Sequence, residues 1–158
     1  MTGKPKPKMR LRDKILIVVL VPFLIPIALC MLIALPIASL LVHLSIWSFW
    51  NTRGVRCLFV HSNSPVWQDH IEKEILPRLP KRSIVLNWSE RKKWRPSLAA
   101  MVFHHFGGYR DFNPLGVVIK PFRRAKVFRF HEAFAEYKHG KPEMLAKMES
   151  DFFSTLSK

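Results

Sequence analysis

Hydrophobic and polar residues are distributed differently in two parts of the chain. Residues 15–52 contain no Asp, Glu, Lys or Arg, and this apolar run is much longer than the roughly 18 residues that indicate a membrane span. From residue 53 onwards, short apolar runs alternate with polar segments, which is typical of a small folded domain. The pattern therefore predicts a basic tail at 1–14, a membrane anchor at 15–52 and a soluble α/β domain at 53–158.

The apolar run is too long for one straight transmembrane helix. As a helix it would reach roughly 57 Å, whereas the hydrocarbon core of a bilayer is about 30 Å thick. Pro22, Pro26 and Pro36 are positions where the helix can bend, since each proline removes a backbone donor. We favour a helical hairpin with a break near Pro36. The alternative is a bent helix with a single span, followed by a helix in the far interface.

The distribution of charge indicates an orientation. Positions 1–14 hold six basic residues and one acidic residue, and positions 53–158 hold 20 basic and 10 acidic residues. Basic segments next to a span tend to stay in the cytoplasm, and Arg53 and Arg56 follow the apolar run directly. A hairpin would therefore give a cell-membrane protein with a cytoplasmic domain, whereas a single span would export the domain. The two cysteines, Cys30 and Cys57, fit a reducing compartment.

Short apolar runs and amphipathic stretches alternate in the soluble part. Apolar runs rich in β-formers predict strands at 57–61, 83–88, 115–120 and 125–130. Amphipathic spacing predicts helices at 66–79, 97–106 and 131–139, and a further helix after Pro142. The order is βαβαββα. We expect strands joined through helices to be parallel, and the short link between the last two to give an antiparallel hairpin.

The spacing within two of these helices predicts which side chains enter the core. In the second helix the expected buried face consists of Leu98, Met101, Val102 and His105. In the last helix it consists of Met144, Leu145, Met148, Phe152 and Leu156. Both sets recur at three- and four-residue intervals, as one face of a helix requires.

Two stretches carry a resemblance to a known fold family. The sequence FVHSNSPVW, at 59–67, leads from the first strand into a helix, and YRDFNPLGVVIKPFRRAKVFRF, at 109–130, has Pro114 directly before the terminal hairpin. With the element order, these features resemble the thioredoxin-like fold. The resemblance covers residues 56–157 and implies a small three-layer α/β domain. It also implies a cis peptide before Pro114 and a groove between Asn113-Pro114 and Ser62–Trp67, open to a peptide or a glutathione-like ligand.

The groove implied by the resemblance departs from the redox members of that family. They carry cysteine at the start of the first helix, where the thiol pKa is lowered, whereas this chain has SNSPVW there. We therefore expect no thiol–disulfide exchange. The candidate ligand-binding residues of the groove are Ser62, Asn63, Ser64, Trp67, Asn113 and Pro114. Their hydroxyl groups could bind an anion at a helix N-terminus, although Ser64 acting simply as a helix cap is the more common use.

Basic and aromatic residues are mixed in the segment NWSERKKWRP. Arg91, Lys92, Lys93 and Arg95 lie beside Trp88 and Trp94, and Arg123 and Arg124 form a second basic cluster. A solvated basic loop with packed tryptophans is the simple interpretation. The functional interpretation is contact with anionic lipid headgroups, which the membrane anchor favours over nucleic acid, since each basic residue near such a surface contributes about 1 kcal/mol.

The remaining polar residues suggest no metal site, cofactor or catalytic group. The histidines are scattered, without the i, i+4 pair that places two metal ligands on one helical face. The sequence therefore predicts a binding or accessory domain at the membrane surface, with the bilayer, anionic headgroups or a membrane protein as partner. The alternative is a glutathione-dependent or other cysteine-free enzyme that uses the groove. A nucleic-acid binder is a third option and would show a steep salt dependence.

Overall fold

The computed structural model describes residues 11–108 and 113–157, with side chains from Leu20 onwards. The chain divides into two compact units, Met1–Ser39 and Leu40–Lys158. Helix α1 (Leu11–Ser45) crosses this boundary and continues as the π-helix η1 (Ile46–Asn51). The last turns of the apolar helix therefore belong to the same compact unit as the sheet.

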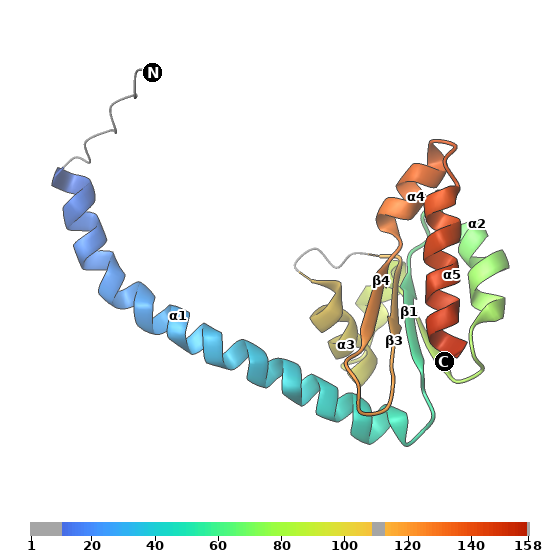
Figure 1. Cartoon of the computed structure of the whole chain (residues 1–158), viewed down its shortest axis with the longest axis horizontal. Coiled ribbons are helices and arrows are strands. Elements are labelled where there is room, and N and C mark those ends of the chain that lie inside the picture. Colours follow the sequence, from blue (N-terminus) through green and yellow to red (C-terminus); the bar gives the residue numbers. More distant parts are fainter. Residues whose placement is uncertain (1–10, 109–112, 158) are drawn as a thin grey trace, which may run out of the picture. The chain divides into compact units, whose positions relative to one another are not determined.

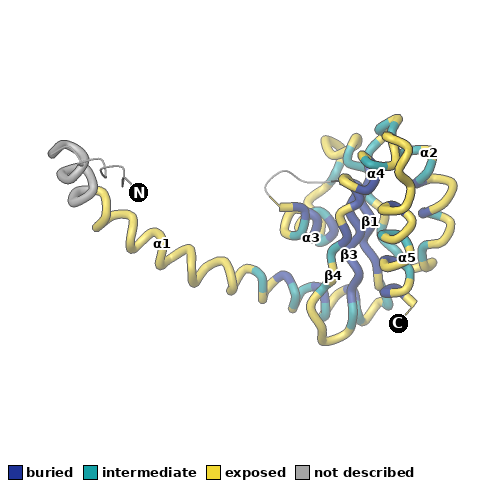
Figure 2. The backbone as a smooth tube through the Cα atoms, turned by 45° about the horizontal axis from the view of Figure 1, so that its top comes forward, coloured by how far each residue is buried: buried dark blue, intermediate teal, exposed yellow. Residues whose placement is uncertain are grey.

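The apolar segment is continuous helix. Pro22, Pro26 and Pro36 all lie inside α1, so the prediction of a hairpin with a break near Pro36 is wrong. Within the described residues, Leu20–Asn51 is the helix that is long and apolar enough to cross a membrane. Residues 20–38 are exposed along their whole length, as Figure 2 shows.

Four strands form one mixed sheet in the order β2-β1-β3-β4. They are β1 (Cys57–His61), β2 (Ser83–Asn87), β3 (Leu115–Val118) and β4 (Lys126–Arg129). The strands β1 and β2 are parallel, with Phe59 opposite Val85, and β3 is antiparallel to both of its neighbours. The predicted strands and terminal hairpin are confirmed, whereas the expectation that every strand joined through a helix is parallel is wrong for β3.

The connection from β2 to β3 explains the direction of β3. Helix α3 (Leu98–Gly107) ends beside the start of β3, because Arg129 Nη2 donates to the Phe106 carbonyl at 3.2 Å and Arg129 lies opposite Leu115 in the register. The chain thus leaves β2 and enters β3 at the same end of the strands, beside the carboxyl end of β1. A strand that begins where its predecessor ended must run in the opposite direction.

The helices around the sheet follow the prediction in position, with local differences. The first predicted helix is a succession of α2 (Gln68–His70), the π-helix η2 (Ile71–Ile75) and the 3₁₀ helix η3 (Leu76–Arg78). Helix α3 begins at the cap Ser97, whose hydroxyl accepts from the Ala100 amide at 3.2 Å, and ends at Gly108, where φ is 79°. The remaining helical segments are the 3₁₀ helix η4 (Trp88–Lys93), α4 (His131–Lys138) and α5 (Glu143–Ser157).

The buried faces of α3 and α5 only partly match the prediction. In α3, Ala99, Val102 and Phe103 are buried, whereas Met101 and His105 are exposed. The side of α3 that packs on the sheet is therefore turned from the predicted one, because the large ring of Phe103 enters the core. In α5, the burial of Leu145, Phe152 and Leu156 confirms the prediction, while Met144 is exposed.

Helices cover both faces of the sheet, as Figure 1 shows, with α2, α4 and α5 on one side and α3 on the other. The first side, here called the phenylalanine face, is the buried cluster Cys57, Phe59, Ile71, Ile75, Val118, Phe128, Phe130, Ala133, Phe134, Leu145, Phe152 and Leu156. The second side, here called the tryptophan face, is the buried cluster Val42, Ile46, Trp50, Leu58, Val60, Ala99, Val102, Phe103, Leu115, Val117 and Ile119, with Trp47, Trp88 and Trp94 partly buried against it. The end of the apolar helix and α3 thus close the tryptophan face together.

Candidate functional site

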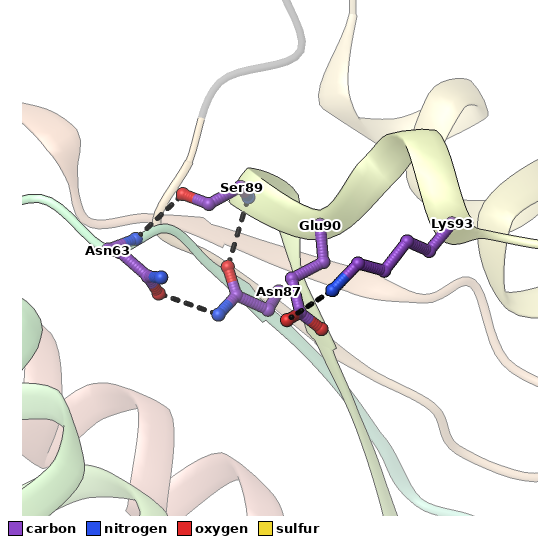
Figure 3. A network of polar contacts seen from close by, with 5 residues as sticks. All are labelled: Asn63, Asn87, Ser89, Glu90 and Lys93. Atoms are coloured by element: carbon purple, nitrogen blue, oxygen red, sulfur yellow. Dashed lines mark hydrogen bonds and ion pairs between the residues drawn. The ribbon is translucent and has the colours of Figure 1, made fainter.

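Asn63 lies in a polar network that joins the carboxyl ends of β1 and β2 (Figure 3). The Asn63 amide donates to Ser89 Oγ at 2.9 Å, and Asn87 Nδ2 donates to Asn63 Oδ1 at 2.6 Å. The Ser89 amide donates in turn to Asn87 Oδ1 at 3.0 Å. These bonds fix the turn after β1 to the turn after β2, so both the backbone and the side chain of Asn63 are already engaged within the fold.

The rest of the turn after β1 is also held by internal bonds. Trp67 Nε1 donates to the Ser62 carbonyl at 3.1 Å, and its ring lies against Phe134 on the phenylalanine face. Ser64 Oγ accepts from the Val66 amide at 3.4 Å, and the Ser64 carbonyl accepts from the Gln68 amide at 2.9 Å. Ser64 therefore organises the start of the helical segment.

The Asn113-Pro114 peptide bond is cis. Pro114 is buried, and its carbonyl accepts from the Phe130 amide at 3.0 Å. Because the register pairs Val60 with Leu115, Pro114 lies next to the end of β1, close to the turn that starts at Ser62. The structure therefore brings the two halves of the predicted groove to the same end of the sheet, at the carboxyl end of β1.

A buried titratable side chain lies at each end of β1, and burial shifts the pKa of both. Burial lowers the pKa of His61, and this effect outweighs the opposing contributions of the Ser62 backbone and Glu72. Burial raises the pKa of the Cys57 thiol to about 12, so Cys57 is protonated and unreactive at neutral pH. In the described part of the chain, no group of three His, Cys, Asp or Glu side chains is placed to hold a metal ion.

The basic segment after β2 combines packed rings with exposed charges. Trp88 and Trp94 pack edge to face, with centroids 5.8 Å apart, and both contact Phe103. Arg91, Lys92, Lys93 and Arg95 are all exposed. The guanidinium of Arg91 lies 4.8 Å above the Trp88 ring, and Lys93 Nζ lies 3.4 Å from Glu90 Oε1 (Figure 3). The tryptophans therefore belong to the core edge, while the cations remain accessible.

The second basic cluster lies at the turn between β3 and β4. Arg123 and Arg124 are exposed there, and beside them Phe122 is 81% exposed with φ at 54°. The Phe122 ring lies 6.1 Å from that of Trp47, near the end of the apolar helix. A smaller pocket of about 310 Å³ adjoins this turn and has Arg56, Lys120 and Arg123 in its wall.

A larger pocket, of about 920 Å³, opens on the tryptophan face. Its wall is formed by three segments: the end of the apolar helix, the segment after β2, and α3. The lining residues are Ser45, Phe49, Trp50, Arg53, Trp88, Arg91, Trp94, Arg95, Pro96, Ser97, Leu98, Ala100, Met101 and His104. The pocket thus includes two predicted cationic residues, Arg91 and Arg95, whereas Lys92 and Lys93 are not in its wall.

Sequence reasoning missed the contribution of the apolar helix to this pocket. Ser45, Phe49 and Arg53 all line it. Ser45 and Phe49 lie four residues apart, which places them on one helical face, and Arg53 lies in the turn directly after the helix. This four-residue spacing was the available signal, since it repeats a hydroxyl, a ring and a guanidinium at the end of the apolar segment.

No family model matches the chain, and comparisons with curated proteins and with solved structures found no match either.

Proposed function

We propose that this protein is a membrane-anchored, thioredoxin-like α/β domain without redox chemistry, with a binding or accessory role at the membrane surface. The supporting observation is the contact between Phe122 and Trp47. It places an exposed ring and the basic cluster Arg123 and Arg124 at the end of the sheet where the apolar helix joins the domain. Exposed aromatic rings and basic side chains at one site are typical of a surface that contacts headgroups.

Several features support the thioredoxin-like part of the proposal. The sheet has one parallel and two antiparallel pairs in the order β2-β1-β3-β4, with helices on both faces. The cis Asn113-Pro114 bond precedes β3, where the resemblance implies it. The turn after β1 contains no sulfur, and Cys57 is buried as a protonated thiol, which supports a function other than redox exchange.

The proposed partner is the anionic headgroup layer of the bilayer. Arg123 and Arg124 follow the exposed Phe122 in the same turn, and Arg56, Lys120 and Arg123 line the adjoining pocket. Each such cation contributes about 1 kcal/mol next to an anionic surface. The positive charge at this end of the domain would also suit a second class of partner, a membrane protein with an acidic surface.

The enzymatic alternative needs ligand-binding groups in the groove after β1. The backbone amide of Asn63 donates to Ser89, and its side-chain oxygen accepts from Asn87. The Ser64 hydroxyl accepts from the Val66 amide. These internal bonds favour a structural role for the turn over catalysis, and we therefore propose binding rather than an enzymatic reaction.

The position of Phe122 provides the test. The full chain, with Cys30→Ser, Cys57→Ala and Phe122→Cys, is labelled with an environment-sensitive fluorophore and reconstituted into nanodiscs. We expect a blue-shifted emission and quenching by lipid-attached quenchers, both stronger in phosphatidylserine than in phosphatidylcholine discs. The matched control carries the label at Lys138→Cys, in the exposed last turn of α4, and should show neither effect. Equal signals at both positions would contradict the proposal.

The proposed orientation places the domain in the cytoplasm. Because the apolar helix is continuous, this orientation puts the basic tail at 1–14 on the far side if the helix spans the bilayer. Arg53, Arg56 and the excess of basic residues at 53–158 support it. The exposed Ser157 gives a suitable labelling position when Cys30 and Cys57 are replaced. An impermeant maleimide should label Ser157→Cys only after cells are permeabilised. Labelling in intact cells would place the domain on the outside and overturn this part of the proposal.

A further inference from the structure

The pocket of about 920 Å³ on the tryptophan face has a size and composition that point to a particular ligand. We propose that it is a discrete site for one anionic phospholipid, which holds an acyl chain against its aromatic wall and the phosphate against Arg53, Arg91 and Arg95. This inference rests on the proposed function, since it requires the domain to lie at a bilayer surface. It adds a saturable site with a defined stoichiometry to that general surface contact.

The apolar part of the pocket is suited to a hydrocarbon chain. Its volume falls within the range of about 300–1,000 Å³ that is usual for small-molecule sites. Phe49 is 56% exposed and Met101 is 46% exposed in its wall, and Trp88 and Trp94 supply further ring surface. An acyl chain would remove this surface from water.

The charged part of the pocket is suited to a phosphate. Arg53, Arg91 and Arg95 all line it, and no carboxylate does so among the described residues. Guanidinium groups bind phosphate oxygens in a bidentate manner, and stacking over Trp88 at 4.8 Å positions Arg91. The first turn of α3, capped by Ser97, also lines the pocket, and the positive end of the helix dipole favours an anion there.

The identity of the occupant follows from how the pocket joins the apolar helix. Ser45 and Phe49 belong to the segment Leu20–Asn51, which is long and apolar enough to cross a membrane, and Arg53 follows that segment by two residues. The pocket wall therefore passes from membrane-type helix to cationic side chain within two helical turns. A molecule that enters it from the bilayer has to be apolar along Phe49 and anionic at Arg53, which describes a phospholipid and excludes a purely polar anion.

Native mass spectrometry of the full chain in detergent micelles tests the proposal, with phosphatidylglycerol and phosphatidylcholine of equal chain length titrated in turn. We expect one phosphatidylglycerol to bind saturably, and phosphatidylcholine to bind at least tenfold more weakly. The double variant Arg91→Gln/Arg95→Gln should lose affinity for phosphatidylglycerol on the order of twentyfold, since two cations near the headgroup are removed. The variant Met101→Trp, which fills the pocket at an exposed position, should weaken the binding of both lipids.

The matched control is Lys138→Gln/Lys147→Gln, which removes the same charge at exposed positions of α4 and α5, away from this pocket. Its affinity for phosphatidylglycerol at the saturable site should stay within twofold of that of the unchanged chain. Thermal unfolding should show that all variants are folded. Equal losses in both double variants, equal affinity for the two lipids, or the absence of a saturable complex would each overturn the site. If the fluorophore at position 122 still reports contact with the bilayer, the proposed function survives such a result. If the pocket binds lipid but that fluorophore reports no contact, the proposed function fails instead.

Discussion

Phenylalanine rings fill one face of the sheet under α2, α4 and α5, whereas α3 and the end of the apolar helix leave a pocket of about 920 Å³ on the other. On the phenylalanine face, Phe59, Phe130, Phe134 and Phe152 are fully buried. On the tryptophan face, large side chains such as Phe49 and Met101 remain partly open to solvent. The same sheet is therefore closely packed on one side, which the smaller pocket of about 310 Å³ reaches at Val118 and Leu156, and hollowed on the other.

Charged side chains differ between the two faces in the same way. Beside the phenylalanine face, Glu149 Oε1 lies 2.6 Å from His70 Nε2 and its Oε2 lies 3.7 Å from Arg78 Nη1. The Arg78 guanidinium also lies 3.9 Å from the centroid of the Phe153 ring. Arg53, Arg91 and Arg95, by contrast, line the pocket without an acidic residue in its described wall. Balanced charge and close packing indicate a face that stabilises the fold, whereas unbalanced charge and open apolar surface indicate a face that binds a partner.

The largest expected effect comes from opening the closely packed face. Phe152→Ala removes a fully buried ring that contacts Phe59, Phe128 and Phe130, and the free energy of unfolding should fall by about 3–5 kcal/mol. Chemical denaturation of the full chain measures this. Phe49→Ala, in the pocket wall, is the matched control and should cost less than half as much. Similar losses for both would show that the two faces are not different in packing.

The reactivity of cysteine should differ between the faces by a large factor. Cys57 lies in the buried cluster of the phenylalanine face, and burial raises the pKa of its thiol to about 12, so maleimide labelling in the native state should be much slower than for an exposed cysteine. With Cys30 replaced, Met101→Cys on the pocket wall should react quickly. Mass spectrometry over a labelling time course compares the two positions. Rapid native labelling of Cys57 would contradict the close packing of this face.

A smaller loss of stability is expected from a substitution where β3 and α5 approach each other closely. A Cβ at Gly116 would lie 2.6 Å from Phe152 Cε2, so Gly116→Ala should lower the free energy of unfolding by about 1–3 kcal/mol through overpacking. The same substitution in a Phe152→Leu background should cost less, because the smaller side chain leaves room for the methyl group. A double-mutant cycle by chemical denaturation measures this coupling. Additive effects would show that the two side chains do not compete for the same space.

The smallest expected effect is a dependence of stability on pH. His61 is 5% exposed, and its pKa in the folded chain is lowered, chiefly because burial disfavours the charged ring. Below about pH 6.5 the unfolded chain binds a proton that the folded chain does not, so the stability of the fold should fall as the pH falls through this range. Thermal unfolding between pH 7.5 and pH 5 should show a shallower decline for His61→Gln than for the unchanged chain. An identical decline would show that His61 does not contribute.

The sequence by itself determined the local elements of the domain. The strands at Cys57–His61 and Ser83–Asn87, the helix at Leu98–Gly107 and the antiparallel hairpin were predicted, because hydrophobic periodicity and short links act over a few neighbouring residues. It also identified Arg91 and Arg95 as candidate binding residues, since a mixture of basic and aromatic residues is visible in the chain itself. The thioredoxin-like groove around Asn113-Pro114 stays a prediction.

Only the tertiary structure decided features that depend on distant segments or on the surroundings. The direction of β3 and the buried face of α3 follow from where α3 ends on the sheet. Helix α1 continues through Pro36, since a proline can bend a helix without ending it. The pocket requires residues 45–53 to lie against residues 88–104. No local pattern encodes that juxtaposition, because it arises only when both segments pack on the same face of one sheet.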